Sequence, residues 1–133
     1  MKGPELCAGV IVYSEDQVLL IKRGTEPEKG LWSLPGGRVQ LGESIRHAAL
    51  RELKEESNLE GRCEEMIGWV ELKIDQHHFV IVNLRCSVSD YSKLEAGDDA
   101  AEVSFFKREE LQQLEMSART RDFLFSLRPP TPK

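Results

Sequence analysis

The sequence predicts an α+β domain built on a mixed β-sheet. Strand-like apolar segments come first, a helical pattern follows, and further strand-like segments lead to a terminal helix. The chain has 133 residues, of which 40% are hydrophobic, enough for one domain with its own core. We expect that domain to cover residues 1–128 and residues 129–133 to form a flexible tail, because prolines cluster there.

The N-terminal part predicts two antiparallel strands and a long loop. Leu6–Tyr13 is apolar and β-branched, residues 14–17 form a turn, and Val18–Lys22 forms the second strand. Residues 23–42 are rich in glycine and proline, which predicts a structured loop. Long loops inside compact domains are usually functional.

A helix is predicted over Ser44–Ser57. Asn58 would end it, because asparagine tolerates the left-handed backbone conformation. One face is apolar at helical spacing and would pack on the core through Ile45, Ala48, Ala49 and Leu53.

The remainder of the chain predicts strands followed by helices. Cys63–Ile74, Phe79–Val88 and Val103–Phe106 are apolar or alternating and favour strands. Arg108–Leu114 favours a short helix and Ala118–Leu127 a terminal one.

Composition restricts the class of function. The chain carries 18 basic and 23 acidic residues, a net charge of −5, and no basic run, so we expect no nucleic acid partner and no membrane attachment. No apolar run is long enough to span a membrane, and the N-terminus does not look like a signal peptide. The three cysteines have no metal-site spacing, which favours a reducing, cytoplasmic location. A polyanionic substrate would be repelled unless metal ions intervened.

The most informative feature is a group of glutamates at the end of the predicted helix. Glu52, Glu55 and Glu56 lie three and four residues apart and therefore project together. They repel one another, and the helix dipole disfavours anions at this end. Such a cluster calls for a hard divalent cation such as Mg²⁺, which takes carboxylate oxygens and reaches for substrate phosphates.

Neighbouring residues could support this cluster. Arg51 lies one turn before Glu55 and could hold its carboxylate. Glu43 lies half a turn away in projection, so it would have to reach in from the loop by pairing with Arg51. The Gly36-Gly37 pair permits close backbone approach, so the carbonyl of Gly36 could add a metal ligand.

These residues resemble the Nudix box, the pattern G-x5-E-x7-R-E-U-x-E-E-x-G-U in which U is an apolar aliphatic residue. Asn58 stands in place of the last glycine and can take the same cap conformation. The approach to the box, residues 31–36, also looks like that of the family. The matching residues are Gly37, Glu43, Arg51, Glu52, Leu53, Glu55, Glu56 and Leu59.

The resemblance implies an α/β/α sandwich with a central mixed sheet and hydrolysis of a pyrophosphate bond by water. It implies that Glu52, Glu55 and Glu56 bind Mg²⁺, with Mn²⁺ as the alternative, and that Arg51 and Glu43 form a supporting pair. Glu102 resembles the additional glutamate that some members use as a metal ligand or general base. A surface residue is the alternative for Glu102, and the choice of base between Glu52 and Glu102 stays open.

We expect the substrate to be a nucleoside diphosphate linked to a further group X. Residues 96–103 resemble a stretch of the family's ADP-ribose pyrophosphatases, which makes ADP-ribose the first candidate, with AMP and ribose 5-phosphate as products. The absence of a proline between Pro35 and Pro129 argues against that branch. The alternatives are a nucleoside triphosphate pyrophosphohydrolase and a non-catalytic nucleotide-binding module. We assign substrate binding to Arg23, Trp32, Gly37 and Arg38, and family habit suggests a homodimer.

Several other residues have ordinary structural interpretations. Asp98-Asp99 is interpreted as a turn with Gly97, or alternatively as part of an acidic site loop with Glu102. The histidines lack ligand spacing, although His77-His78 could line a cleft. Trp32 suits packing of the loop, and Trp69 and Phe79 suit either the core or stacking on a base.

Overall fold

The computed structural model describes residues 3–128, so the expected tail at 129–133 lies outside the described residues. Most of the predicted elements are present. In chain order they are β1 (Glu5–Ile11), β2 (Tyr13–Ser14), β3 (Gln17–Arg23), β4 (Trp32–Ser33), β5 (Gly36–Arg38), α1 (Ile45–Ser57), β6 (Gly61–Ile74), β7 (His77–Val88), β8 (Ala100–Lys107), the 3-10 helix η1 (Arg108–Gln113) and α2 (Ala118–Ser126).

Two sheets form the centre of the molecule. The first has the strand order β5-β1-β7-β6 and is mixed, because β1 runs parallel to β7 while the other neighbours are antiparallel. In the second sheet, β3 pairs with β2, β4 and β8, all antiparallel. The expected α+β class with a central mixed sheet is confirmed.

Two sequence-based boundaries need correction. The strand expected over Leu6–Tyr13 is divided at Val12, so β1 joins the mixed sheet while β2 forms a hairpin with β3 in the second sheet. The segment 23–42 is not a loop throughout, because it contains β4 and β5. Strand β5 is built largely of glycine and pairs with β1 from the edge, so its short length and composition hid it from pattern reasoning.

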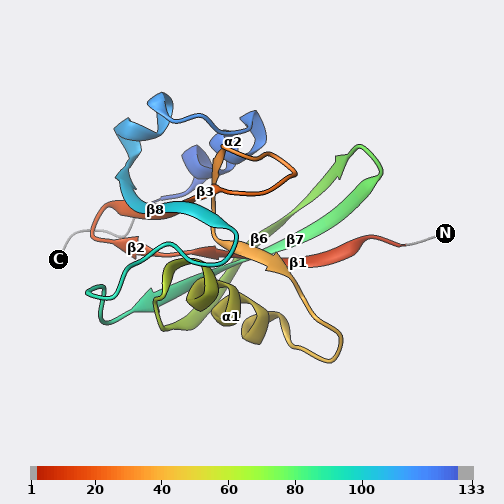
Figure 1. The fold of residues 1–133 in the computed structure, drawn as a ribbon, viewed down its shortest axis with the longest axis horizontal. Coiled ribbons are helices and arrows are strands. Elements are labelled where there is room, and N and C mark those ends of the chain that lie inside the picture. Colours follow the sequence, from red (N-terminus) through yellow and green to blue (C-terminus); the bar gives the residue numbers. More distant parts are fainter. Residues whose placement is uncertain (1–2, 129–133) are drawn as a thin grey trace.

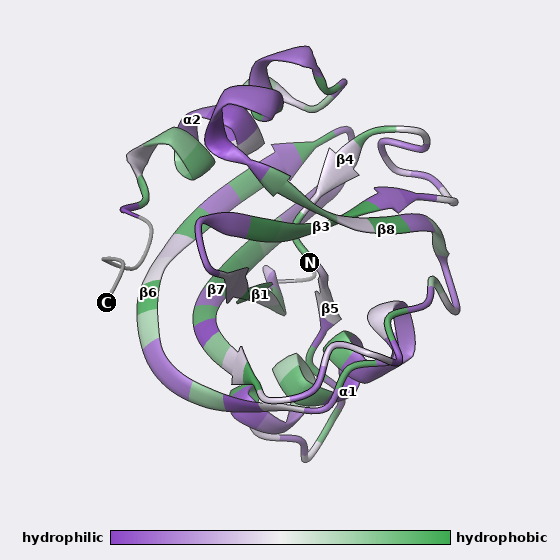
Figure 2. Ribbon diagram, turned by 90° about the vertical axis from the view of Figure 1, so that its left-hand side faces the viewer, coloured by the Kyte–Doolittle hydropathy of each residue, from purple (hydrophilic) through white to green (hydrophobic). Residues whose placement is uncertain are grey.

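The two α-helices lie on opposite sides of the strands (Figures 1 and 2). Helix α1 begins after Ser44, whose side chain accepts a hydrogen bond from the backbone N–H of His47 at 3.0 Å. It ends at Asn58, which adopts the expected left-handed conformation with φ 63°. No helix of residues 3–128 is long and apolar enough to cross a membrane.

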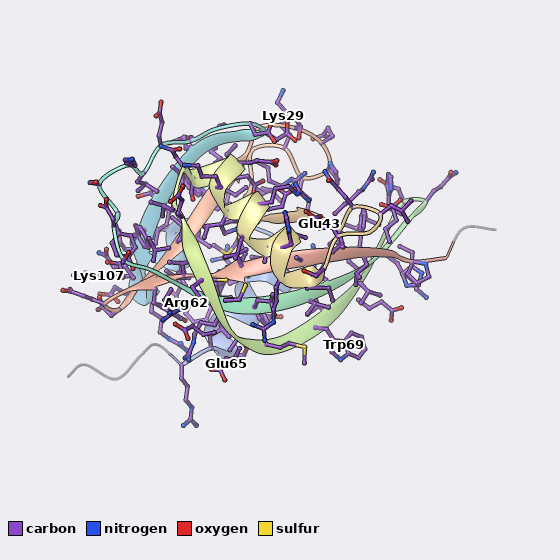
Figure 3. All side chains as sticks on the ribbon, turned by 90° about the horizontal axis from the view of Figure 1, so that it is seen from below. Lys29, Glu43, Arg62, Glu65, Trp69 and Lys107 are labelled. Atoms are coloured by element: carbon purple, nitrogen blue, oxygen red, sulfur yellow. The ribbon has the colours of Figure 1, made fainter. Side chains whose placement is uncertain are left out.

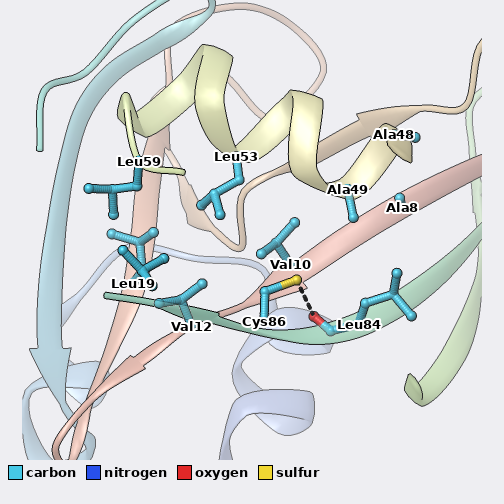
Figure 4. Packing of buried hydrophobic residues seen from close by; sticks show 11 residues of the cluster. Ala8, Val10, Val12, Leu19, Ala48, Ala49, Leu53, Leu59, Leu84 and Cys86 are labelled. Carbon is cyan, nitrogen blue, oxygen red and sulfur yellow. Dashed lines mark hydrogen bonds between the residues drawn. The ribbon is translucent and has the colours of Figure 1, made fainter. Parts of the chain in front are cut away.

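Helix α1 packs its small apolar face on the mixed sheet. Ala48, Ala49 and Leu53 are fully buried and face β1 and β7 (Figure 4). Burying a leucine side chain contributes about 2 kcal/mol, so this contact fixes the helix firmly on the sheet. The predicted core face of the helix is therefore confirmed, and the glutamates are left at its C-terminal end, at the sheet edge formed by β5.

The outer surface of β6 carries exposed apolar side chains. Trp69 is 63% exposed and points away from the body of the protein (Figure 3), so it neither belongs to the core nor lines a cavity. Helix α2 covers a second apolar cluster that contains Ile11, Leu20 and Leu124. Between this helix and the mixed sheet the structure leaves a cavity.

Candidate active site

The cavity has a volume of about 620 Å³ and lies over one face of the mixed sheet. Alternate residues of a strand point to the same face, and the cavity is lined by the alternate series of β6 and β7 together with residues 7–9 of β1. Helix α2 and residues 25–28 supply the opposite wall. At one end it is bordered by the box residues Gly37, Arg51, Glu52 and Glu56, while Glu55 lies outside the lining. The volume is in the usual range for small-molecule sites.

Glu56 is the most buried of the box glutamates, with 4% of its surface exposed. Its carboxylate accepts a hydrogen bond from the backbone N–H of Gly36 at 2.8 Å. Burial raises the pKa of Glu56 to about 8 despite this bond, and the nearby charge of Glu52 raises it further. A carboxylate held in this environment gains strongly from a bound cation.

Glu52 rests directly on the backbone of Gly37. A Cβ atom placed on Gly37 would lie 2.5 Å from the carboxylate carbon of Glu52, which no real contact allows. Residue 37 is therefore glycine because the glutamate occupies the space of a side chain. Burial raises the pKa of the Glu52 carboxyl, while Arg51 partly opposes that rise.

Arg51 connects the loop to the helix. Its Nε and Nη2 donate to the two carboxylate oxygens of Glu43 at 2.7 and 2.9 Å, which confirms the expected pairing. Its Nη1 donates to Glu52 at 2.8 Å and to Glu55 at 3.2 Å. Hydrogen bonds from Arg51 lower the pKa of Glu43 to about 2. Such a bidentate arrangement needs the planar guanidinium and would not survive replacement by lysine.

The donor set at this end suits a hard divalent cation. Carboxylates of Glu52, Glu55 and Glu56 and the carbonyl of Gly36 are oxygen ligands of the kind that Mg²⁺ takes. Within residues 3–128, no three acidic, histidine or cysteine side chains already converge closely enough to hold an ion. Arg51 accounts for part of this, because it engages an oxygen of Glu52 and an oxygen of Glu55. The oxygen ligands are of the type that binds Mg²⁺. To bind the ion, the carboxylates of Glu52 and Glu55 would have to rotate away from Arg51.

The structure separates the remaining predicted residues into two groups. Arg23, Gly37 and Arg38, for which the sequence predicts substrate binding, line the cavity. Trp32 lies outside the lining and packs edge-on against Phe106 with ring centroids 4.8 Å apart, so packing of the loop is its role in this structure. Glu102 also lies outside the lining: it is 59% exposed and its carboxylate is 3.4 Å from Nζ of Lys22.

The Asp98-Asp99 segment forms the expected turn and also borders the site. Both aspartates line the cavity, and the charge of Asp98 contributes to the raised pKa values of Glu52 and Glu56. Asp98 itself has φ 53°, as the turn interpretation requires. The two interpretations hold together, but Glu102 is not part of this acidic group.

Other cavity residues were not identified from the sequence. Asn83 on β7 and three residues of α2, Arg119, Thr120 and Phe123, line it. Nη2 of Arg119 is held at 3.1 Å by Glu28 of the opposite loop. No motif marks these residues, because strands and a helix that are distant in sequence bring them together. His77 and His78 do not line the cavity.

Comparison with known proteins identifies related sequences. The chain is 34% identical over 113 residues to the ADP-ribose pyrophosphatase of Methanocaldococcus jannaschii, covering 84% of this chain and 66% of the relative. It is 39% identical over 59 residues to the human 8-oxo-dGDP phosphatase NUDT18, covering 44% of this chain and 18% of the relative. The chain thus spans less than two thirds of the length of both curated relatives.

A solved structure extends the likeness to the whole fold. The crystal structure of a MutT NUDIX hydrolase from Burkholderia pseudomallei superimposes with a TM-score of 0.83 at 26% identity, covering 96% of this chain and all of the other. Residues 3–127 match the sequence profile of the NUDIX domain. The box residues, the fold and this profile match together show that the chain belongs to the NUDIX domain family.

Proposed function

We propose that this protein is a Mg²⁺-dependent hydrolase that cleaves the pyrophosphate bond of a nucleoside diphosphate linked to X. ADP-ribose is the first candidate substrate, and AMP and ribose 5-phosphate are the products. The observation that carries the proposal is the position of the box: Glu52 and Glu56 border one end of a cavity of about 620 Å³, beside Arg23 and Arg38. Carboxylates for a metal and arginines for phosphates thus face the same space.

Each box residue then has a defined task. Glu52, Glu55 and Glu56 and the Gly36 carbonyl would hold the metal, which neutralises phosphate charge and lowers the pKa of water when bound. Arg51 orients Glu52 and Glu55 through its hydrogen bonds, and Glu43 fixes Arg51 from the loop. Arg23 and Arg38 would bind the diphosphate oxygens and compensate the repulsion between an acidic site and an anionic substrate.

We assign the general base to Glu52 in preference to Glu102. Glu52 lines the cavity and is 13% exposed, whereas Glu102 lies outside it and is engaged by Lys22. A base must reach the attacking water within hydrogen-bonding distance, directly or through one more water. Glu52 can do so without a rearrangement of the second sheet.

The choice of ADP-ribose is supported by the similarity to the ADP-ribose pyrophosphatase of Methanocaldococcus jannaschii. That similarity extends over 84% of this chain. A second candidate, removal of damaged nucleoside di- or triphosphates, is supported by the similarity to the 8-oxo-dGDP phosphatase. Both reactions would use the same box residues. The two reactions differ in the part of the substrate beyond the phosphates that the rest of the cavity must bind.

The test is a Mg²⁺-dependent hydrolysis panel that compares ADP-ribose, deoxynucleoside triphosphates and 8-oxo-dGDP, with products identified by mass. The proposal expects AMP and ribose 5-phosphate, and loss of activity with EDTA. Cleavage of the triphosphates or of 8-oxo-dGDP alone would move the substrate to the second candidate. Tight binding of a nucleotide with no turnover of any member would instead favour a binding module. Replacing Glu55 by glutamine should reduce turnover while the far-ultraviolet circular dichroism spectrum stays unchanged.

Two further expectations belong to this proposal. The three cysteine thiols are free in the structure, which is consistent with a reducing, cytoplasmic location. A homodimer is expected from the family resemblance, and the exposed side chains of Met66 and Trp69 on β6 offer an apolar surface for it. Sedimentation of the purified protein checks the oligomeric state.

A further inference from the structure

The floor of the cavity differs in chemistry from its acidic end. On β6, the residues that point into the cavity are Val70, Leu72 and Ile74, and on β7 they are Phe79, Ile81 and Asn83. All are apolar except Asn83. A single carboxamide in an otherwise aliphatic and aromatic floor is costly to bury unless it forms hydrogen bonds.

The side chain of Asn83 is buried among protein atoms yet open to the cavity. Only 3% of the residue is exposed, and within residues 3–128 no hydrogen bond joins its carboxamide to another residue. Among the described residues, the only side-chain polar atom that is both sealed from solvent and without a hydrogen bond is Oε2 of Glu5. The polar atoms of Asn83 are therefore not sealed off. The unmet donors and acceptor of the amide are therefore available to a molecule in the cavity.

Gly9 leaves the room that the amide needs in this position. Gly9 on β1 is paired directly with Asn83 on β7, and a Cβ atom on Gly9 would lie 2.2 Å from Oδ1 of Asn83. The carboxamide thus occupies the space that a side chain at position 9 would fill. Any side chain at position 9 would push it away, so the two residues form one unit.

The same row of the sheet leads to the catalytic end. Gly9 is paired on its other side with Gly36 of β5, whose N–H bonds to Glu56. Adjacent strands lie about 4.8 Å apart, so Asn83 and the Gly36 backbone are separated by about 10 Å. One nucleotide can bridge that distance, with its phosphate at the box and its base over the floor.

We propose that Asn83, positioned by Gly9, is the specificity-determining residue of a nucleobase subsite on this floor. The inference rests on the proposed function for the orientation of the substrate. A neutral amide, with one acceptor and two donors, complements the polar edge of a heterocyclic base, whereas a phosphate would favour an arginine. The surrounding aliphatic side chains suit the faces of a flat ring.

Phe79 is less suited to select the base. Its ring already stacks with His77, with centroids 5.4 Å apart and planes 8° apart, and Cζ of Arg38 lies 6.0 Å from its centroid. These two neighbours restrict the use of the Phe79 ring as a stacking platform. Hydrogen bonding by Asn83 therefore carries the discrimination, and stacking on Phe79 does not.

The test compares binding of AMP and ribose 5-phosphate, each with Mg²⁺, by isothermal titration calorimetry. Wild-type protein should bind AMP more tightly than ribose 5-phosphate. Asn83→Leu keeps the side-chain size. It should weaken the binding of AMP about tenfold and leave the binding of ribose 5-phosphate unchanged, since only the base loses a hydrogen bond. Gly9→Ala should have the same selective effect although Asn83 is still present. Ser87→Ala, an exposed position of the same strand, is the matched control.

A kinetic comparison separates this inference from the proposed function. With ADP-ribose and a diphosphate that carries ribose at both ends, Asn83→Leu should lower kcat/KM only for the first. The role of Asn83 would be overturned if Asn83→Leu lowered kcat/KM equally for both substrates, or if the variant bound AMP as tightly as wild type. So would a wild-type protein that binds AMP no better than ribose 5-phosphate. Because binding of AMP needs no turnover, a failure to hydrolyse ADP-ribose would refute the proposed function and leave the base subsite to be judged by the calorimetry.

Discussion

The two ends of the cavity are built in opposite ways. At the acidic end, Arg51 connects Glu43, Glu52 and Glu55, so charged groups are fixed by several short hydrogen bonds. On the floor, apolar side chains of β6 and β7 surround the single amide of Asn83. The first end can perform chemistry on any diphosphate, while the second can distinguish one attached group from another. Changes at the acidic end should therefore reduce turnover of every substrate, and changes on the floor should alter the choice among substrates.

The largest effect is expected for Glu56→Gln. Loss of this carboxylate should lower kcat by about 10² or more for all substrates, because a metal ligand disappears. The metal-free variant should nevertheless be more stable than wild type. In the folded protein Glu56 has a pKa of about 8, above its unfolded value, so the folded state binds more protons and wild-type stability falls as pH rises from about 4.3 to 8. At pH 7 the gain on removing the charge is at most about 4 kcal/mol.

Thermal unfolding in EDTA between pH 5 and pH 9 measures this effect. The difference in Tm between Glu56→Gln and wild type should grow as pH rises to about 8 and level off above that pH. A constant difference would show that Glu56 is ionised in the metal-free fold at low pH. Unchanged turnover in Mg²⁺ would remove Glu56 from the site altogether.

An intermediate effect is expected for Gly37→Ala. The added Cβ would collide with the carboxylate of Glu52, so the glutamate must move and kcat should fall by about tenfold to a hundredfold. Gly68→Ala on β6 is the matched control, because its Cβ would meet nothing within 4 Å. Steady-state rates of both variants with ADP-ribose test the difference. Equal activity of the two variants would mean that Glu52 does not need its position over the glycine.

The smallest effect concerns acid stability. Arg51 and the backbone of Gln40 hold the pKa of Glu43 at about 2, below its unfolded value. The stabilisation from this pair is therefore complete above about pH 4.3 and is lost as pH falls towards 2. Glu43→Gln should flatten the Tm profile between pH 5 and pH 2.5 relative to wild type, with circular dichroism as the measurement. Identical profiles would show that Arg51 gives Glu43 no net stability.

The same contrast explains what sequence reasoning could find. The helix and its end at Asn58 follow from local spacing, and the pairing of Arg51 with Glu43 follows from the family resemblance; the structure has all three, with Ser44 capping the helix instead of lying inside it. The cavity floor could not be derived, because Asn83 acquires its meaning only from Gly9 on the neighbouring strand.

Local pattern also left the surroundings of two residues undecided. Glu102 precedes a strand-like segment, as the resemblance required, but pairing of β8 with β3 brings it to Lys22. Trp32 lies in the box approach, yet contact with Phe106 of β8 directs it into packing. In both cases a partner far along the chain determined where the side chain lies. Spacing along one segment carries no information about such partners.

The most direct test of the account compares Glu52→Gln with Glu102→Gln on ADP-ribose at saturating Mg²⁺. If the chemistry belongs to the box end, Glu52→Gln should lower kcat by about 10² to 10⁴, as expected for loss of a general base, while Glu102→Gln stays within a few-fold of wild type. The reverse order would contradict the account, because it would place the base on β8 and require a rearrangement that brings Glu102 into the cavity.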